Sequence, residues 1–440
     1  MRNLPILVLL VAATACGGTD PSASGVFPTA GFLGRSVRVE ISGDATEWGA
    51  SAKVSFGEGI TVDSVTVASP TALFADITIA DNAPVGLRDV VVTGGDNVTL
   101  KQAFEIESPI TITLRGSAAQ GSIAVLDIVN HDFDTPFDTA STGDGFFTPL
   151  EFTNISATAG NGVRVQVDNV TPYGLSATLL IDIDAQTGAL AFTSGPTGGT
   201  TVKFPLGADV AIAARTAMPL TAGMTATATS TKPLESFLYE FTPAAFPALA
   251  RFQASTSGMG NPGVAVLPAS GHFADLLGAA ADQRQVAKTA GKFYAVLFDL
   301  SGETGAYTIR AGSSLLTIAA DTEPGNNTQA GAIACALPCL VQNATIPTAV
   351  DQDWFVFTAV ANDVGKKVRV RTLAGDDMTD TRVEVLAGAT TLGGPSGDNG
   401  YHENHLSAAI TAAGPISTKI YASPEYDPAQ THYDALMYLE

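Results

Sequence analysis

An internal repeat of about 100 residues, written in short alternating segments, constrains the fold more than any other feature of this sequence. Segments 67–79 and 169–181 match without a gap, at a single offset. The matched pairs are Pro70/Pro172, Leu73/Leu175, Ala75/Ala177, Ile77/Leu179, Ile79/Ile181, Ala83/Ala185 and Gly86/Gly188. One β-sandwich domain is about 100 residues long, so this spacing predicts consecutive sandwiches of similar design.

The segments themselves predict antiparallel strands. Apolar residues alternate with polar ones at 37–41 and 73–79, and glycine and aspartate stand between such runs. This period of two is typical of strands buried on one face. Charged residues make up 15% of the chain, and the best helical candidate, 273–288, lies inside a β-rich stretch. We therefore expect an all-β fold of tandem β-sandwiches.

The first copy resembles the immunoglobulin-like IPT/TIG family. The segments that carry this resemblance are FPTAGFLG at 27–34, VEISG at 39–43 and VSFG at 54–57. The resemblance covers residues 26–107, and in the second copy it covers only the second half. The first half of the second copy carries an insertion, NHDFDTPFD at 130–138, that the first copy lacks. The resemblance implies two Ig-like domains, at 26–107 and 108–215.

A second and different repeat follows. Its matched segments are Tyr239-x-Phe241-Thr242 with Phe355-x-Phe357-Thr358, Val264-x-Val266-Leu267 with Val383-x-Val385-Leu386, Lys292-Phe-Tyr294-Ala295 with Lys419-Ile-Tyr421-Ala422, and Tyr307 with Tyr433. The later copy also contains DTEPGNN at 321–327 and DQDWFVF at 351–357. These phrases resemble the pre-peptidase C-terminal (PPC) family of small jelly-roll-like sandwiches. The resemblance implies PPC-like domains at 216–312 and 313–440, with a linker at 313–321.

In some members of that family the opening acids and the later aspartate pair bind calcium. Carried over by position, the candidate ligands are Asp321, Glu323, Asn326, Asp351 and Asp353. Oxygen ligands from two segments suit an ion that takes about six to eight of them. Gly325 and Asn326 depart from the family pattern and remove a ligand and a charge. The alternative is that the first phrase is only a turn and strand cap.

The insertion in the second copy is a weaker metal candidate. Asp132, Asp134, Asp138 and Asp144 superficially suggest a calcium loop. The loop lacks the glycine and the final acid that would make the match specific. A solvated loop is the favoured interpretation.

Three cysteines are present, and two of them stand close together. Cys335 and Cys339 lie in one short segment, and no further Cys or His lies near them. A cysteine pair in an exported protein forms a disulfide more often than a metal site. We expect these two cysteines to form a local disulfide.

The third cysteine, Cys16, follows a leader with one basic residue and a short apolar stretch. The stretch is too short to span a membrane and predicts a cleaved export signal. Its small residues before Cys16 resemble the lipobox of bacterial lipoproteins, although Ala13 stands where leucine is usual. That resemblance implies a signal peptide at 1–15, acylation of Cys16, a tether at 16–25 and, with Gly17 next, the outer membrane. An ordinary secretory peptide cleaved after Ala15 is the alternative.

Composition narrows the function further. The net charge of −21 disfavours a nucleic-acid partner. No elbow or zincin motif surrounds the five histidines, so we expect no enzyme activity. The aromatic residues on predicted strands favour a core over a ligand platform; these are Tyr294, Trp354, Phe355, Phe357 and Tyr421.

The sequence therefore predicts a non-catalytic outer-membrane or surface lipoprotein that acts as a binding, adhesion or spacer module. The membrane is one expected partner, through the lipid anchor, and a polymer, carbohydrate or protein is the other. An accessory subunit beside a secreted peptidase is the alternative, because PPC-like domains often accompany peptidases. An unrecognised hydrolase is the third hypothesis, and it requires histidines and aspartates oriented in one pocket.

Overall fold

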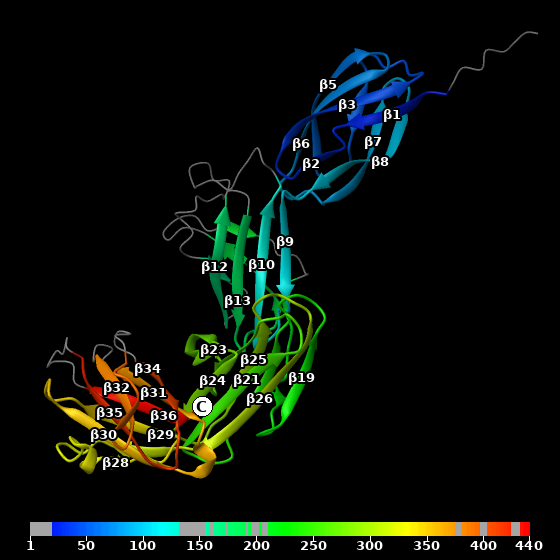
Figure 1. Ribbon diagram of the computed structural model, residues 1–440. Helices are drawn as coiled ribbons and strands as arrows, with labels where there is room; N and C mark the ends of the chain where they lie inside the picture. The colour runs from blue at the N-terminus through cyan, green and yellow to red at the C-terminus, as the bar shows by residue number, and fades with distance from the viewer. Residues whose placement is uncertain are drawn as a thin grey trace, which may run out of the picture.

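The computed structural model describes residues 20–131, 155–157, 162–171, 174–190, 192–194, 202–204, 210–374, 380–396, 403–423 and 432–440. Within these residues the chain is built from β-strands and three short 3-10 helices, which confirms the all-β fold. The strands form four units that follow one another in chain order (Figure 1). Cys16 and the acidic insertion at 132–144 lie outside the described residues. The domain limits given above stay predictions.

Unit 1 is a sandwich of two four-stranded sheets, ordered β1-β3-β6-β5 and β2-β8-β7-β4. Alternate residues of each strand point inward, and Phe56 and Phe104 pack edge to face at a centroid distance of 5.2 Å in the core. The strands are β1 (Ser22–Phe27), β2 (Ala30–Phe32), β3 (Ser36–Asp44), β4 (Lys53–Ser55), β5 (Ile60–Ser69), β6 (Ala72–Ile79), β7 (Gly86–Thr93) and β8 (Val98–Glu107).

Unit 2 repeats the first sheet of unit 1, in the order β12-β13-β10-β9. Smaller sheets, β11-β15-β16 and β14-β17, accompany it. The strands are β9 (Ile110–Gly116), β10 (Ser122–Asn130), β11 (Ile155–Ala157), β12 (Val163–Thr171), β13 (Gly174–Ile181), β14 (Gly188–Ala189), β15 (Phe192–Ser194), β16 (Val202–Phe204) and β17 (Ala211–Ile212).

Unit 3 packs a five-stranded sheet, β18-β20-β25-β22-β23, against a four-stranded sheet, β19-β26-β21-β24. Its elements are β18 (Met218–Pro219), β19 (Thr225–Ser230), β20 (Phe237–Phe241), β21 (Ala248–Thr256), β22 (Pro262–Leu267), η1 (Phe273–Asp275), β23 (Gly278–Ala280), β24 (Asp282–Ala287), β25 (Phe293–Asp299) and β26 (Gly305–Leu315). The best helical candidate of the sequence, 273–288, forms the short helix η1 and the strands β23 and β24.

Unit 4 has two five-stranded sheets, β28-β30-β35-β32-β33 and β27-β29-β36-β31-β34. Its elements are β27 (Thr317–Ala320), η2 (Gln329–Gly331), β28 (Ile333–Ala334), β29 (Cys339–Thr345), β30 (Gln352–Ala359), η3 (Ala361–Asp363), β31 (Lys367–Ala374), β32 (Thr381–Ala387), β33 (Thr390–Gly393), β34 (Asn404–Ala409), β35 (Gly414–Ala422) and β36 (His432–Leu439).

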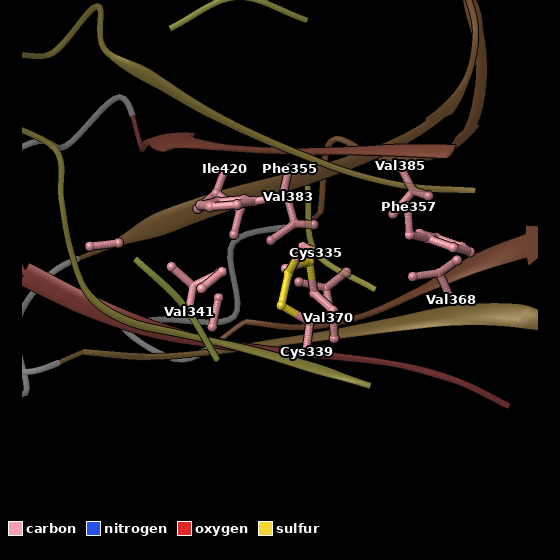
Figure 2. Close-up of a cluster of buried hydrophobic side chains, with 14 of the residues drawn as sticks. Cys335, Cys339, Val341, Phe355, Phe357, Val368, Val370, Val383, Val385 and Ile420 are labelled. Carbon is pink, nitrogen blue, oxygen red and sulfur yellow. A yellow bond between two sulfur atoms is a disulfide. The ribbon is translucent and has the colours of Figure 1, made fainter. Parts of the chain in front are cut away.

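The core of unit 4 contains the expected disulfide. Cys335 and Cys339 are bonded and almost fully buried among valine, isoleucine and phenylalanine side chains (Figure 2). Cys335 follows β28 of one sheet, and Cys339 begins β29 of the other. The bridge therefore joins the two sheets across the core, although it closes a loop of only a few residues.

Strand topology reproduces both sequence repeats. β6 and β13 are equivalent central strands, and the turns after them both close with a backbone hydrogen bond, from Ala83 N to Ala80 O and from Ala185 N to Asp182 O. Units 3 and 4 share strand order throughout, apart from the added β27 in unit 4. The matched Lys-x-Tyr segments do not occupy equivalent places in the two sheets. Ala295 pairs with Tyr239, whereas Phe355, the sequence match of Tyr239, pairs with Thr418. Thr418 stands four residues before Ala422, the sequence match of Ala295.

Two of the junctions between units are closed by apolar side chains. Between units 2 and 3, the unit 3 residues Leu238, Phe273, Val296 and Phe298 pack against Ile123, Leu180 and Ile183 of unit 2. Between units 3 and 4, Leu249, Val286 and Leu316 pack with Leu340, Leu436 and Tyr438. No such buried cluster joins units 1 and 2 in the part of the chain that the structure describes.

The segment expected as a linker, 313–321, joins units 3 and 4, and strands run into it from both sides. β26 extends to Leu315 and β27 starts at Thr317, so Leu316 alone separates them. Leu316 is buried, and its N–H donates to Pro247 O at 2.9 Å. The chain therefore passes from unit 3 to unit 4 without a flexible segment.

No described helix is long and apolar enough to cross a membrane.

The junction of units 2 and 3 yields a direct test. Gly271 has a φ of +73°, and a Cβ there would overlap the side chain of Ile183 from unit 2. Gly302 has a similar φ of +74°, but the nearest atom to its Cβ would be 3.8 Å away. Gly271→Ala is expected to lower the free energy of unfolding by about 1–3 kcal/mol more than Gly302→Ala. Calorimetric unfolding measures this, and equal losses in the two variants would contradict it.

Candidate metal centre

A group of oxygen-bearing side chains closes one end of the unit 4 sandwich. Asp353 lies at the start of β30 on its inward face, and Asp351 precedes that strand. Asp321 follows β27, and the loop after it supplies Glu323 and Asn326. All five residues predicted from the sequence thus come from the two segments that flank this end of the core.

Hydrogen bonds tie these segments together. The Asn326 side chain donates from Nδ2 to Asp321 Oδ1 at 2.9 Å and to Asp353 Oδ1 at 3.1 Å. Asn327 Nδ2 donates to Asp351 Oδ1 at 2.6 Å. The Asn326 amide therefore acts as a donor between two carboxylates that would otherwise repel one another, and the Asn327 amide is a donor to a third.

Two further residues hold the carboxylates in place. The Tyr433 hydroxyl, on β36 of the opposite sheet, donates to Asp353 Oδ2 at 2.6 Å. Thr345, at the end of β29, donates to Asp321 Oδ2 from its backbone N at 3.0 Å and from its hydroxyl at 3.2 Å. Both sheets therefore contribute to one polar cluster at the end of the core.

Several oxygens of this cluster are buried and have no partner. These atoms are Asn326 Oδ1, Asn327 Oδ1 and Asp351 Oδ2. Asn326 and Asp353 are fully buried, and Asp351 is 4% exposed. A buried acceptor without a donor or cation costs about 1–3 kcal/mol, so a cation bound at these oxygens would be stabilised.

The electrostatics indicate the same ligand. The cluster has four carboxylates, those of Asp321, Glu323, Asp351 and Asp353. None of them forms an ion pair with a Lys or Arg among the described residues. Burial, followed by the charge of Glu323, raises the pKa of Asp351 to about 6. Burial and the charge of Asp321 raise the pKa of Asp353 to about 8, against the opposing hydrogen bond from Tyr433. The two buried aspartates therefore hold their protons more strongly than exposed aspartates do, and a bound cation would favour their ionised forms.

The donor set fits a hard divalent cation. One carboxylate oxygen each from Asp321, Glu323 and Asp353 lie within 4.8 Å of one another. The set holds only oxygen atoms, which calcium prefers, and it lacks the nitrogen and sulfur ligands typical of zinc. Asp351 and Asn326 add oxygens from the same two segments, so the residues present fit calcium.

Sequence reasoning missed three residues of this cluster. Asn327 carries an unpartnered buried oxygen, and its position beside Asn326 is the signal that could have indicated it. Tyr433 was paired with Tyr307 only as a repeat position. Thr345 gave no signal, because its role depends on where β29 ends.

The end of the unit 3 sandwich that corresponds to the carboxylate cluster of unit 4 has no such cluster among its described residues. Phe237 occupies the register position of Asp353, and the Tyr307 hydroxyl donates to Glu303 O at 2.8 Å instead. The buried Asp299 of unit 3 is saturated by N–H and O–H donors from Asn261, Ser301 and Glu303. At this end unit 3 therefore has an apolar side chain and a hydrogen-bonded aspartate in place of the carboxylate cluster.

A second group of possible ligands lies between units 2 and 3. One ligand atom each from Asp182, Asp184 and His272 lie within 4.8 Å of one another. Asp182 accepts a hydrogen bond from Phe273 N at 2.6 Å, and His272 Nε2 lies 3.2 Å from Asp184 Oδ2. The pKa of His272 is raised by its hydrogen bond to Asp184. These contacts account for the group as an inter-unit hydrogen-bond set.

The five aromatic residues expected on strands are mostly buried. Phe355 and Phe357 lie in the interior of unit 4 (Figure 2), and Tyr294 lies in the junction with unit 2. Trp354 is also buried, whereas Tyr421 is half-buried and its hydroxyl donates to Glu384. An exposed aromatic platform is therefore not formed by these five residues.

Comparisons with known proteins assign no family to this chain. No protein-family model and no curated protein matches the chain. Among solved structures, the Escherichia coli adhesin FdeC shares 13% identity, with 65% of this chain and 90% of that chain covered and a TM-score of 0.20.

Two further structures show a similar degree of likeness. The periplasmic inhibitor of g-type lysozyme PliG from Aeromonas hydrophila shares 12% identity over 22% of this chain and 96% of its own, with a TM-score of 0.19. The Yersinia pseudotuberculosis adhesin InvE shares 14% identity, with 47% of this chain and 67% of that chain covered and a TM-score of 0.17. Likeness at these TM-scores assigns neither a family nor a function to this chain.

We expect calcium to stabilise unit 4. A ligand that binds only the folded state at about 100 times its Kd adds about 2.7 kcal/mol to the free energy of unfolding. Differential scanning calorimetry in calcium and in chelator should show one transition moving to higher temperature with calcium. Asp353→Asn should remove that response. Asp299→Asn, in unit 3, should lower stability equally with and without calcium. Coincident traces for the unmodified protein would contradict the prediction.

Asn326→Asp separates the metal role from a purely structural one. Without calcium, the new carboxylate replaces the donor that separates Asp321 from Asp353, so the melting temperature should fall. With calcium, the added charge should lower the Kd by about tenfold, which corresponds to about 1.4 kcal/mol. Calorimetric titration measures the affinity. A structural hydrogen-bond cluster would lose stability under both conditions and gain no affinity.

Proposed function

We propose that this chain is a non-catalytic, envelope-tethered binding module whose four units form an arm that projects from a lipid anchor. The observation that carries this proposal is the pair of closed junctions around unit 3. Apolar clusters fix unit 3 to unit 2 and to unit 4, and Leu316 alone connects the last two units. Fixed junctions make units 2 to 4 a stiff array suited to presenting a surface at a distance.

Polar contacts reinforce the first of these junctions. Arg215 donates to Gln120 O of unit 2 at 2.9 Å and to Ser236 O of unit 3 at 2.6 Å. The Phe273 N–H of unit 3 donates to the Asp182 carboxylate of unit 2, which is nearly buried. A junction with satisfied polar groups and apolar packing resists bending more than an apolar contact alone.

The direction of the array supports attachment through the N-terminus. Unit 1 lies at the opposite end of the array from unit 4 (Figure 1), and its first strand already begins at Ser22, within the segment 16–25 expected as a tether. An acyl group on Cys16 would thus leave units 3 and 4 far from the membrane. Calcium at the unit 4 cluster would consolidate the distal end of such an arm.

The described histidines support a non-catalytic role. His131 Nε2 lies 2.7 Å from Thr111 Oγ1, and His272 contacts Asp184. His405 is half-buried, and burial lowers its pKa. These three histidines lie in units 2, 3 and 4, and the fourth described histidine, His432, begins β36 of unit 4. The histidines of units 2, 3 and 4 thus do not converge on one pocket as a hydrolase would require.

Substitution of the acylated residue tests the proposal. Cys16→Ser should leave the calorimetric profile of the four units unchanged and move the protein from the membrane fraction to the soluble exported fraction. Thr19→Ala, three residues further on, should remain in the membrane fraction. Mass spectrometry of the mature N-terminus should show two or three acyl chains on Cys16. Retention of Cys16→Ser in washed membranes would overturn the tethered arrangement.

A further inference from the structure

A groove separates units 3 and 4 beside their apolar junction. Its walls are the outer faces of the sheets that contain β21, β24 and β26 of unit 3 and β31 and β36 of unit 4. Two hollows of about 530 and 810 Å³ make up the groove. Both are lined by Arg251, Arg284, Lys366 and Tyr438, so they are parts of one continuous depression.

The groove is basic on an acidic protein. The chain has 22 basic and 43 acidic residues. The groove is lined by six of the basic residues and three of the acidic ones; these are Arg251, Arg284, Arg310, Lys366, Arg369 and Arg371, with Asp282, Asp363 and Glu440. The sign of the local charge is thus opposite to that of the whole protein.

Four of these cations have structural partners. Arg251 binds Asp282 through Nε at 3.0 Å, and Arg369 binds Glu440 through Nε and Nη2 at 3.2 and 3.1 Å. Lys366 lies 3.0 Å from Asp363. Arg284 reaches Glu440 at 3.5 Å and lies 4.4 Å above the Tyr438 ring, so it links unit 3 to unit 4.

Two cations remain unpaired. The side chains of Arg310 on β26 and Arg371 on β31 form no ion pair or hydrogen bond with any described residue, and they come from different units. Arg310 lines one hollow and Arg371 lines the other. An anionic ligand that lies along the groove would meet an unpaired guanidinium in each hollow, with paired cations between them.

The other lining groups indicate the chemistry of that ligand. Amides and hydroxyls occupy the walls between the cations; these are Gln253, Gln283, Ser313, Ser314 and Asn404. Such groups match the hydroxyls of sugars, and guanidinium groups match carboxylates in planar, two-point geometry. Apolar side chains are few in the larger hollow, which disfavours an extended peptide that needs pockets for alternate side chains.

We propose that this groove binds a carboxylated polysaccharide, with uronate groups at Arg310 and Arg371. The proposal rests on the function proposed above and names the ligand class of that binding module. The size of the hollows suits a few sugar rings, and the acidic surface beyond them limits how much of a highly charged polymer can bind.

The test uses the mature exported chain carrying Cys16→Ser, and tetragalacturonate as the probe. Calorimetric titration is done without added calcium, because galacturonate itself binds calcium. We expect binding to tetragalacturonate that weakens with salt, and none to a neutral tetrasaccharide. Arg310→Gln with Arg371→Gln should weaken binding by about tenfold or more. Lys53→Gln with Lys288→Gln, which removes two exposed cations elsewhere, should leave affinity unchanged.

Three results would overturn the proposal. They are no binding of tetragalacturonate, equal binding by the double arginine variant, or tetraglutamate binding as tightly as tetragalacturonate, which would assign the groove to an acidic peptide. None of these bears on membrane attachment, which the Cys16→Ser fractionation decides separately. Failure of the ligand class is therefore distinguishable from failure of the tethered arm.

Discussion

Burial of the outer faces of unit 3 is the constraint on which the rest of the arrangement depends. The sheets of a β-sandwich usually bury one face and leave the other polar and solvated. Unit 3 instead carries Leu238 and Val296 outward on one sheet and Leu249 and Val286 outward on the other. Each such side chain stabilises its junction by about 1.5–3 kcal/mol when fully buried. Neighbouring sandwiches on both sides therefore become part of the folded state of unit 3.

The same strand order serves a different purpose in unit 4. The register position of Leu238 is taken by Trp354, whose neighbours across the sheet are Lys419 and Glu384. Lys419 and Glu384 lie 3.5 Å apart and form a charged pair on this outer face. This face therefore does not reproduce the apolar surface by which unit 3 holds unit 2. Charged residues at a few outward positions thus distinguish this face from the docking face of unit 3, while the inward residues of both units form a sandwich core.

Much of the fold followed from period-two patterning, and much of the assembly did not. The patterning located the paired strands, and the two acidic phrases located the polar cluster of unit 4, because both depend on residues that are close in sequence. Alternation does not show whether an apolar residue such as Leu249 or Val296 faces a core or a neighbouring unit. Segment 313–321 looked like a linker because its role as strand and junction depends on contacts with units on both sides. The groove was equally hidden, since Arg310 and Arg371 stand 61 positions apart and meet only after the units have docked.

Strand β36 connects the two sites and also keeps them independent. Tyr433 points inward and donates to Asp353, whereas Leu436 and Tyr438, on the opposite face of the same strand, pack into the junction beside the groove. β36 is hydrogen bonded to β29 on one side and to β31 on the other. A shift of β36 along its axis would break both ladders and turn its inward residues outward. An ion at the polar cluster can therefore stabilise the end of the sandwich without displacing Tyr438, and an anion in the groove leaves Tyr433 in place. The proposed ion site and the proposed groove therefore lie on opposite faces of one strand, and occupation of one requires no movement at the other.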